Sequence, residues 1–190
     1  MQKLTIALVS LFSFAASASE VEHYKQGFVA TIEAPLGFTY YSESSLQVSG
    51  VSLGLDVSLG GAVTRNIVIS GHIWGSYLTN PTVWSNGRSV TLDNSSVTAG
   101  AVGPQFTYYF VPSNWSLSGT VGVGLVSANF DGKTVNSDGG LAAQFGVAKQ
   151  WYVGDRTSLG VSMHLNLSSN GDADATLSGT GVDAAFIVSF

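Results

Sequence analysis

Residues 51–59 read VSLGLDVSL, and every second residue of this stretch is a large aliphatic. The positions between them hold Ser52, Gly54, Asp56 and Ser58. Because successive side chains of a β-strand point to opposite faces, this alternation places all the aliphatic side chains on one side. The same period of two recurs in residues 117–125 and 159–167, and no stretch of comparable strength has helical spacing. The sequence therefore predicts an all-β protein whose strands each have one apolar face.

The chain is poor in charged residues for its length of 190 residues. Charged residues make up 10% of the chain and hydrophobic residues 45%, whereas soluble domains are roughly 25% charged. Much of the surface is therefore expected to contact something other than water. A net charge of -5 with only seven Lys and Arg residues excludes an extended basic surface for nucleic acid. The absence of cysteine excludes disulfides and thiolate metal sites.

Residues 1–18 have the features of a secretory signal peptide. Lys3 supplies the positive charge, residues 4–15 are largely apolar, and Ala16-Ser17-Ala18 has the small residues of a cleavage site. We expect residues 19–26 to form a short periplasmic segment and residues 27–190 to form the folded domain. That domain has no apolar run near the roughly 20 residues of a membrane-spanning helix. A closed β-barrel is the other structure that satisfies every backbone group in lipid.

Eight strands are predicted, and their connections alternate between short and long. The three short connections are residues 64–66, 112–114 and 154–156, and the longer ones are residues 42–47, 81–95, 131–138 and 171–178. Outer-membrane barrels have tight periplasmic turns and longer outer loops. The alternation therefore predicts an eight-stranded antiparallel up-and-down transmembrane β-barrel with both termini in the periplasm. The predicted strands are residues 27–41, 48–63, 67–80, 96–111, 115–130, 139–153, 157–170 and 179–190.

Aromatic residues gather at both predicted ends of the barrel, where the membrane interfaces would lie. At the periplasmic end they are Phe106, Tyr108, Phe110, Trp115 and Trp151, and at the outer end Phe38, Tyr40, Tyr77 and Phe130. Pro35 and Pro104 fall inside predicted strands. Because proline cannot donate to a β-ladder, we expect each to mark a bulge or an early strand end.

The last predicted strand ends in a pattern typical of a known class of protein. Alternate residues that share the predicted lipid face are Val182, Ala184, Phe186, Val188 and the terminal Phe190. This pattern resembles the signal that outer-membrane proteins present to the barrel-assembly machinery. Residues 27–190 as a whole resemble small outer-membrane β-barrels of the outer-membrane protein A and X type. The resemblance implies insertion into the lipid of the bacterial outer membrane with that machinery as partner. It implies no single activity, since such barrels include anchors, adhesins, enzymes and carriers.

Charged and imidazole side chains fall on the inward face of several predicted strands. The lumen of an eight-stranded barrel is just wide enough for its own side chains. These inward residues form either a proton-linked or catalytic cluster or a hydrogen-bonded core, and the core is favoured because buried charges must be paired. We therefore expect no open pore. The candidate cluster comprises Glu33, Asp56, His72, His164 and Asp183, and Trp74, Gln144 and Asn166 are further large inward residues.

For function the sequence favours a structural or surface-interaction protein that acts through its outer loops. The longest predicted loop, residues 81–95, carries Trp84 and Arg88 as candidates for contact with a surface partner. We expect a monomer that is not an enzyme and needs no cofactor or metal. The alternative is a narrow carrier or channel for small hydrophobic solutes, which would need a large apolar interior. An outer-membrane lipid acyl hydrolase is the third reading: His164 and Ser168 resemble residues of lipid A deacylases, but Asn166 stands where that family has serine.

Overall fold

The computed structural model describes residues 25, 27–111, 113–172 and 175–190. The predicted signal peptide and all of the segment 19–26 except Lys25 lie outside the described residues. In the described part of the chain, no helix has the length and hydropathy needed to cross a membrane.

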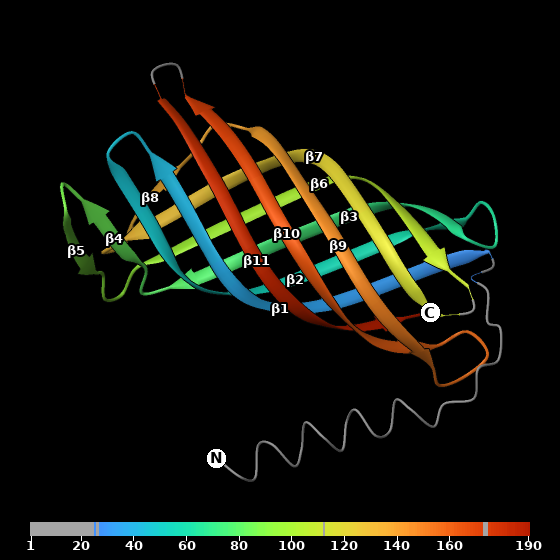
Figure 1. Cartoon of the computed structure of the whole chain (residues 1–190). Coiled ribbons are helices and arrows are strands. Elements are labelled where there is room, and N and C mark those ends of the chain that lie inside the picture. Colours follow the sequence, from blue (N-terminus) through green and yellow to red (C-terminus); the bar gives the residue numbers. More distant parts are fainter. Residues whose placement is uncertain (1–24, 26, 112, 173–174) are drawn as a thin grey trace, which may run out of the picture.

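Eight long antiparallel strands form a closed barrel in which each strand pairs with the next and the last pairs with the first (Figure 1). This confirms the predicted all-β, up-and-down barrel. Three short strands, β4 (Thr82–Ser85), β5 (Arg88–Thr91) and β8 (Lys133–Asn136), lie in the outer connections. The barrel strands are β1 (Phe28–Glu43), β2 (Leu46–Ala62), β3 (Ile67–Thr79), β6 (Ser96–Phe110), β7 (Trp115–Phe130), β9 (Gly140–Tyr152), β10 (Ser158–Asp172) and β11 (Ala175–Ser189).

The apolar face of every barrel strand points outward. Leu53 and Val121 are each 59% exposed, whereas the adjacent Ser52 is 4% exposed and the adjacent Thr120 is 1% exposed. The arrangement is the reverse of a soluble barrel, in which the aliphatic side chains would fill the interior. An outward aliphatic surface of this kind suits a barrel surrounded by lipid.

Two of the predicted outer connections are shorter in the structure than in the prediction. β1 and β2 extend until only Ser44 and Ser45 separate them, and Ser44 takes the positive φ of 49° that such a turn requires. β10 and β11 likewise extend to Asp172 and Ala175. The connections predicted at residues 42–47 and 171–178 are therefore present but shorter, because each flanking strand extends further than predicted. A strand that continues beyond the membrane meets water on its outer face and loses the apolar alternation by which it is recognised.

The two prolines mark neither a bulge nor a strand end, contrary to expectation. In the β1–β2 ladder, Glu33 pairs with Asp56 and Leu36 pairs with Leu53, so no residue is inserted around Pro35. The β6–β7 ladder keeps its register across Pro104 in the same way. Each proline interrupts the ladder to one neighbouring strand and keeps its place in the ladder to the other. A glycine lies beside Pro35, where a Cβ on Gly54 would be 3.1 Å from the proline Cγ, so the two strands pack closely without the missing bond.

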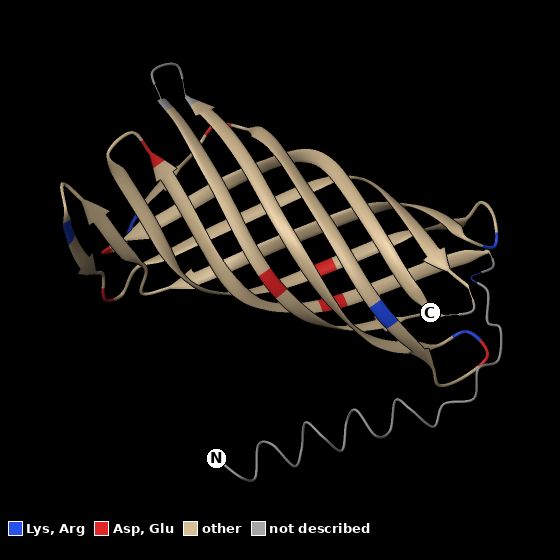
Figure 2. Cartoon of the chain, viewed as in Figure 1, with Lys and Arg blue, Asp and Glu red and all other residues tan. Residues whose placement is uncertain are grey.

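Charged residues gather in the connections at both ends of the barrel, and few lie along the strands (Figure 2). At the periplasmic end the Lys149 ammonium donates to the Ser113 carbonyl and lies 5.9 Å from the centroid of the Trp115 ring. Lys149 thus reaches the edge of the apolar belt from an outward position, as a long charged side chain does at a membrane interface.

Candidate functional site

The barrel interior is filled in layers from one end to the other. Near the outer end, five inward residues form a buried apolar cluster: Tyr41, Val48, Leu78, Val97 and Val126. Near the periplasmic end a second apolar cluster contains Val29, Val68 and Tyr109. Polar side chains occupy the interior between these clusters.

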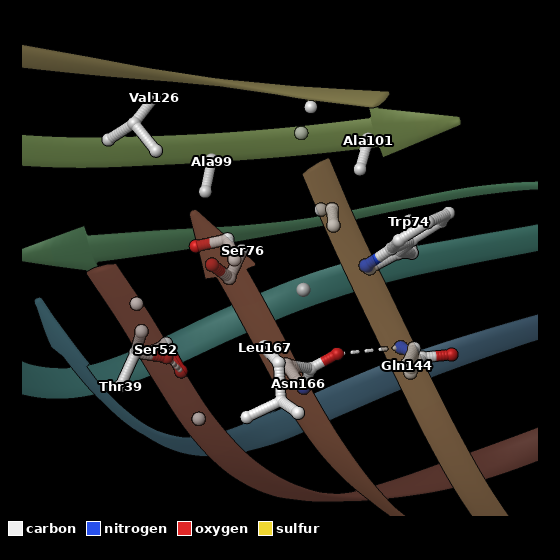
Figure 3. A pocket seen from close by; sticks show the side chains of 18 of the residues that line it. Thr39, Ser52, Trp74, Ser76, Ala99, Ala101, Val126, Gln144, Asn166 and Leu167 are labelled. Atoms are coloured by element: carbon white, nitrogen blue, oxygen red, sulfur yellow. Dashed lines mark hydrogen bonds between the residues drawn. The ribbon is translucent and has the colours of Figure 1, made fainter. Parts of the chain in front are cut away.

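A band of hydrogen-bonded side chains crosses the middle of the lumen. The Gln144 amide nitrogen donates to Asp56 at 2.9 Å and to Asn166 at 3.0 Å, and the second of these bonds is drawn in Figure 3. The Asn166 amide nitrogen donates in turn to Asp183 at 2.6 Å. Trp74, directly opposite Asp56 in the β2–β3 ladder, adds its ring to the same layer. Five strands thus contribute side chains to this band.

His164 connects the band to a third carboxylate, that of Glu33. Its Nδ1 lies 2.7 Å from an Asp183 oxygen and its Nε2 lies 3.2 Å from Glu33 Oε2. The Ser162 hydroxyl donates to the same Glu33 oxygen at 2.6 Å. Both ring nitrogens of histidine donate only in the imidazolium form, so this geometry suits a cation between two carboxylates.

His72 belongs to a separate group. Its Nδ1 lies 3.1 Å from the Thr120 hydroxyl and 3.3 Å from the Gln105 amide nitrogen, and its ring stacks on Trp74 with centroids 5.1 Å apart. Of the five predicted cluster residues, hydrogen bonds and ion pairs therefore join Glu33, His164, Asp183 and, through two amides, Asp56, whereas His72 contacts this band only through its stacking on Trp74. The alternation of inward and outward residues along the strands could by itself have added Ser162, Thr120 and Gln105 to the candidate cluster residues.

Two small cavities lie along the lumen, one on each side of the polar network. The one toward the outer end has a volume of about 60 Å³ and is lined by Asp56, Trp74 and Asp183, while the other, of about 30 Å³, is lined by Glu33 and His164. Since one ordered water needs roughly 10–15 Å³ measured this way, they suit small groups of water molecules. Every buried side-chain nitrogen and oxygen of the described residues has a hydrogen-bond partner.

Lys25, just before β1, closes the periplasmic end. Its ammonium donates to Ser189 at 2.7 Å and to Ser158 at 3.3 Å, and it lies 5.3 Å from the centroid of the Tyr152 ring. Burial lowers the pKa of Lys25 from 10.5 to about 8. The sequence gives no signal for this position, because the residue precedes the first alternating strand.

His164 and Ser168 do not form the hydroxyl–imidazole pair of a serine hydrolase. Ser168 is four residues from His164 on the same strand, a distance of about 13 Å along it. Ser162 is nearer, but its hydroxyl donates to Glu33 and not to the imidazole. No group of three or more His, Asp and Glu side chains in the described ranges could hold a metal ion.

The most prominent outer feature is the hairpin formed by β4 and β5. β4 extends the barrel sheet by pairing with the start of β2, and β5 pairs with β4 beyond the barrel wall (Figure 1). Asn86 and Gly87 form the turn, both with positive φ. Trp84 is 47% exposed and Val90 is 59% exposed, and Arg88 is also exposed. The structure therefore places both predicted contact residues on one exposed hairpin.

No protein-family model and no curated protein sequence matches the chain. Among solved structures, Neisserial surface protein A superposes with a TM-score of 0.58 at 13% identity, over 87% of this chain and 98% of that one. The attachment invasion locus protein Ail of Yersinia pestis gives a TM-score of 0.49 at 11% identity, over 85% and 99% of the two chains. OprG of Pseudomonas aeruginosa gives 0.47 at 13% identity, over 88% and 98%. The chain has the fold of the small eight-stranded outer-membrane β-barrels.

Proposed function

We propose that this outer-membrane barrel is a monomeric, non-catalytic surface protein with a closed lumen, in which the barrel anchors the outer loops. The observation that carries the proposal is the layered filling of the interior. An apolar cluster near each end and the polar band between them occupy the path that a solute would take. An eight-stranded barrel has no spare width around such a filling.

The outer hairpin supports a role in contact with a surface partner. Its exposed aromatic and basic residues, Trp84 and Arg88, are types that often anchor protein interfaces. The hairpin continues the barrel sheet through the β2–β4 ladder, which holds it above the membrane on a rigid base. A carrier of hydrophobic solutes is less well supported, because Gly, Ser, Thr and Ala line most of the larger cavity.

Single-channel recording in planar bilayers tests the closed lumen. We expect purified monomer, shown to be folded by its heat-dependent shift on a gel, to give no steady conductance steps. Regular steps that scale with protein concentration would contradict the proposal.

Replacing residues 82–91 by a short turn tests the role of the hairpin in the same cells. The barrel should still insert, because β4 and β5 lie outside the closed ring of strands. We expect surface adhesion or cell aggregation to fall, with detergent resistance of the membrane unchanged. If detergent resistance falls and adhesion does not, the protein stabilises the membrane and the hairpin is not a contact surface.

A further inference from the structure

The seam between β1 and β11 differs from the other seven seams of the barrel, because the chain does not connect its two strands. At every other seam the strands follow one another along the chain, directly or through an outer connection. Here the ladder runs from Thr31 opposite Ser189 to Ser42 opposite Ser178. Thr31 and Ser189 are 158 residues apart in the sequence. Closure of the barrel therefore depends on recognition between distant segments.

The lipid-facing residues of this seam cannot select its register alone. Leu36 lies opposite Ala184 and Phe38 lies opposite Val182, and all four side chains point toward lipid. A shift of two residues keeps each side chain on its own face. It moves β1 by about 7 Å along β11 and leaves the same apolar side chains in the same apolar surroundings. The register must therefore be selected by contacts inside the barrel.

Interior contacts at the seam begin with two polar residues near the start of the described chain. Lys25 donates to Ser189 on β11 and to Ser158 on β10. The Thr31 hydroxyl lies 3.1 Å from the Ser189 hydroxyl. These contacts draw the beginning of the barrel toward its last two strands.

Glu33 makes the strongest contact of this group and reaches across β11 to β10. It accepts a hydrogen bond from Ser162 at 2.6 Å and lies 3.2 Å from His164, while Asp183 of the intervening β11 holds the other side of the imidazole. Among the described residues, the two ion pairs of the lumen both involve His164, and together they join β1, β10 and β11. In the observed register Glu33 lies opposite Ile187 and level with Gly160 on β10. A two-residue shift that brings Leu36 opposite Phe186 would place Glu33 level with Ser158 instead, and so move its carboxylate away from both Ser162 and His164.

We propose that Glu33 excludes the shifted register in which Leu36 lies opposite Phe186. Its carboxylate reaches Ser162 and His164 in the observed register and loses both of them in that shifted one. There the carboxylate would be buried without its charged partner, which costs far more than any loss of apolar contact at the seam.

Cysteine pairs on the lipid face can report the register, because the chain contains no cysteine of its own. Leu36→Cys with Ala184→Cys reports the observed register, and Leu36→Cys with Val182→Cys or Phe186→Cys reports a shift in either direction. The pairs would be joined by a short thiol-reactive linker after refolding in micelles. Each pair would be placed in the parent, Glu33→Gln, His164→Gln and the double variant Glu33→Gln/His164→Gln. Asp56→Asn is the matched control, because it also neutralises a buried carboxylate, but the hydrogen bond that this carboxylate accepts comes from Gln144 on β9 and does not cross the β1–β11 seam.

The parent and Asp56→Asn should link only in the observed register. Loss of a charged hydrogen bond changes a population ratio by about tenfold or more. Glu33→Gln should therefore raise the ratio of linkage at the Leu36/Phe186 pair to linkage at the Leu36/Ala184 pair by at least that factor. The double variant should show the same ratio of shifted to observed linkage as Glu33→Gln alone, since the two residues act as a pair. Loss of all linkage in Glu33→Gln while Asp56→Asn still closes would also support the proposal. It would be overturned if Glu33→Gln behaved like Asp56→Asn, whether both close or both fail, or if the effects of the two substitutions multiplied.

Discussion

At the scale of single residues, Asp183 is the acceptor on which the interior network depends most. It takes the Asn166 amide on one oxygen and the His164 imidazole on the other. Asp183→Ala would leave both donors without their acceptor in the lumen. Because breaking a buried ion pair is strongly destabilising, we expect the free energy of unfolding to fall by about 3 kcal/mol.

Urea unfolding in micelles, followed by tryptophan fluorescence, measures this change. Asp155→Ala, at an exposed periplasmic turn, is the control and should stay within about 0.5 kcal/mol of the parent. Equal effects of the two substitutions would show that the network contributes little to stability.

At the scale of strands, β6 and β7 approach most closely beside Pro104. A Cβ on Gly122 would lie 2.2 Å from the Val102 carbonyl oxygen, a distance that requires the backbone to move. We expect Gly122→Ala to lower the free energy of unfolding by about 1–3 kcal/mol. Gly100→Ala, on the same strand pair with no atom within 4 Å of the added Cβ, should be neutral or slightly stabilising. Comparable losses in both variants would mean that glycine is not needed for this contact.

The last residue completes the closing seam. The Phe190 amide donates to the Ala30 carbonyl at 2.9 Å, the Ala30 amide donates back at 3.1 Å, and the Phe190 side chain is 51% exposed on the lipid side. Deletion of Phe190 should sharply reduce the heat-modifiable form in the outer-membrane fraction, since it removes both bonds and the aromatic end of the proposed assembly signal. Phe190→Tyr keeps the ring and should be mild. Normal insertion of the deletion variant would show that the terminal aromatic is incidental.

The strands could be predicted from the sequence wherever lipid meets their outer face. The alternation in residues 51–59 places Leu53 and Leu55 outside and Asp56 inside, as observed. It could not show that β1 and β2 continue to a two-residue turn, because both faces of their outer ends contain polar residues. Nor could it show that Pro35 leaves the register intact, which depends on the glycine packed beside it.

The inward direction of the candidate site could also be predicted, but its contacts could not. The alternation along each strand places Glu33, His72 and His164 inside the barrel, but it does not show which residues of different strands lie at the same level. The stagger between strands decides that Glu33, aligned with Ile187, reaches His164 two strands away. The same stagger places His72 against Thr120 instead.

At the scale of the whole molecule, polar and apolar residues are separated in two directions, across the barrel wall and along the barrel axis. Across the wall, small and polar side chains point inward and aliphatic side chains point outward. Along the axis, most charged residues lie in the connections at the two ends (Figure 2), and Glu33, Asp56 and Asp183 on the strands between them point into the lumen. Together these features describe a barrel that is stable in a membrane, with a filled lumen and with its distinctive surface in the outer connections.

Nitroxide labels on adjacent residues in a reconstituted bilayer test this arrangement most directly. One label of each pair would replace the outward Leu53, Val121 or Val161, and the other would replace the inward neighbour Ser52, Thr120 or Ser162. The outward labels should be relaxed strongly by oxygen dissolved in the bilayer and weakly by a water-soluble nickel chelate. The inward labels should be protected from both reagents. Strong relaxation of the outward labels by the nickel chelate would contradict a membrane barrel with its apolar face outside.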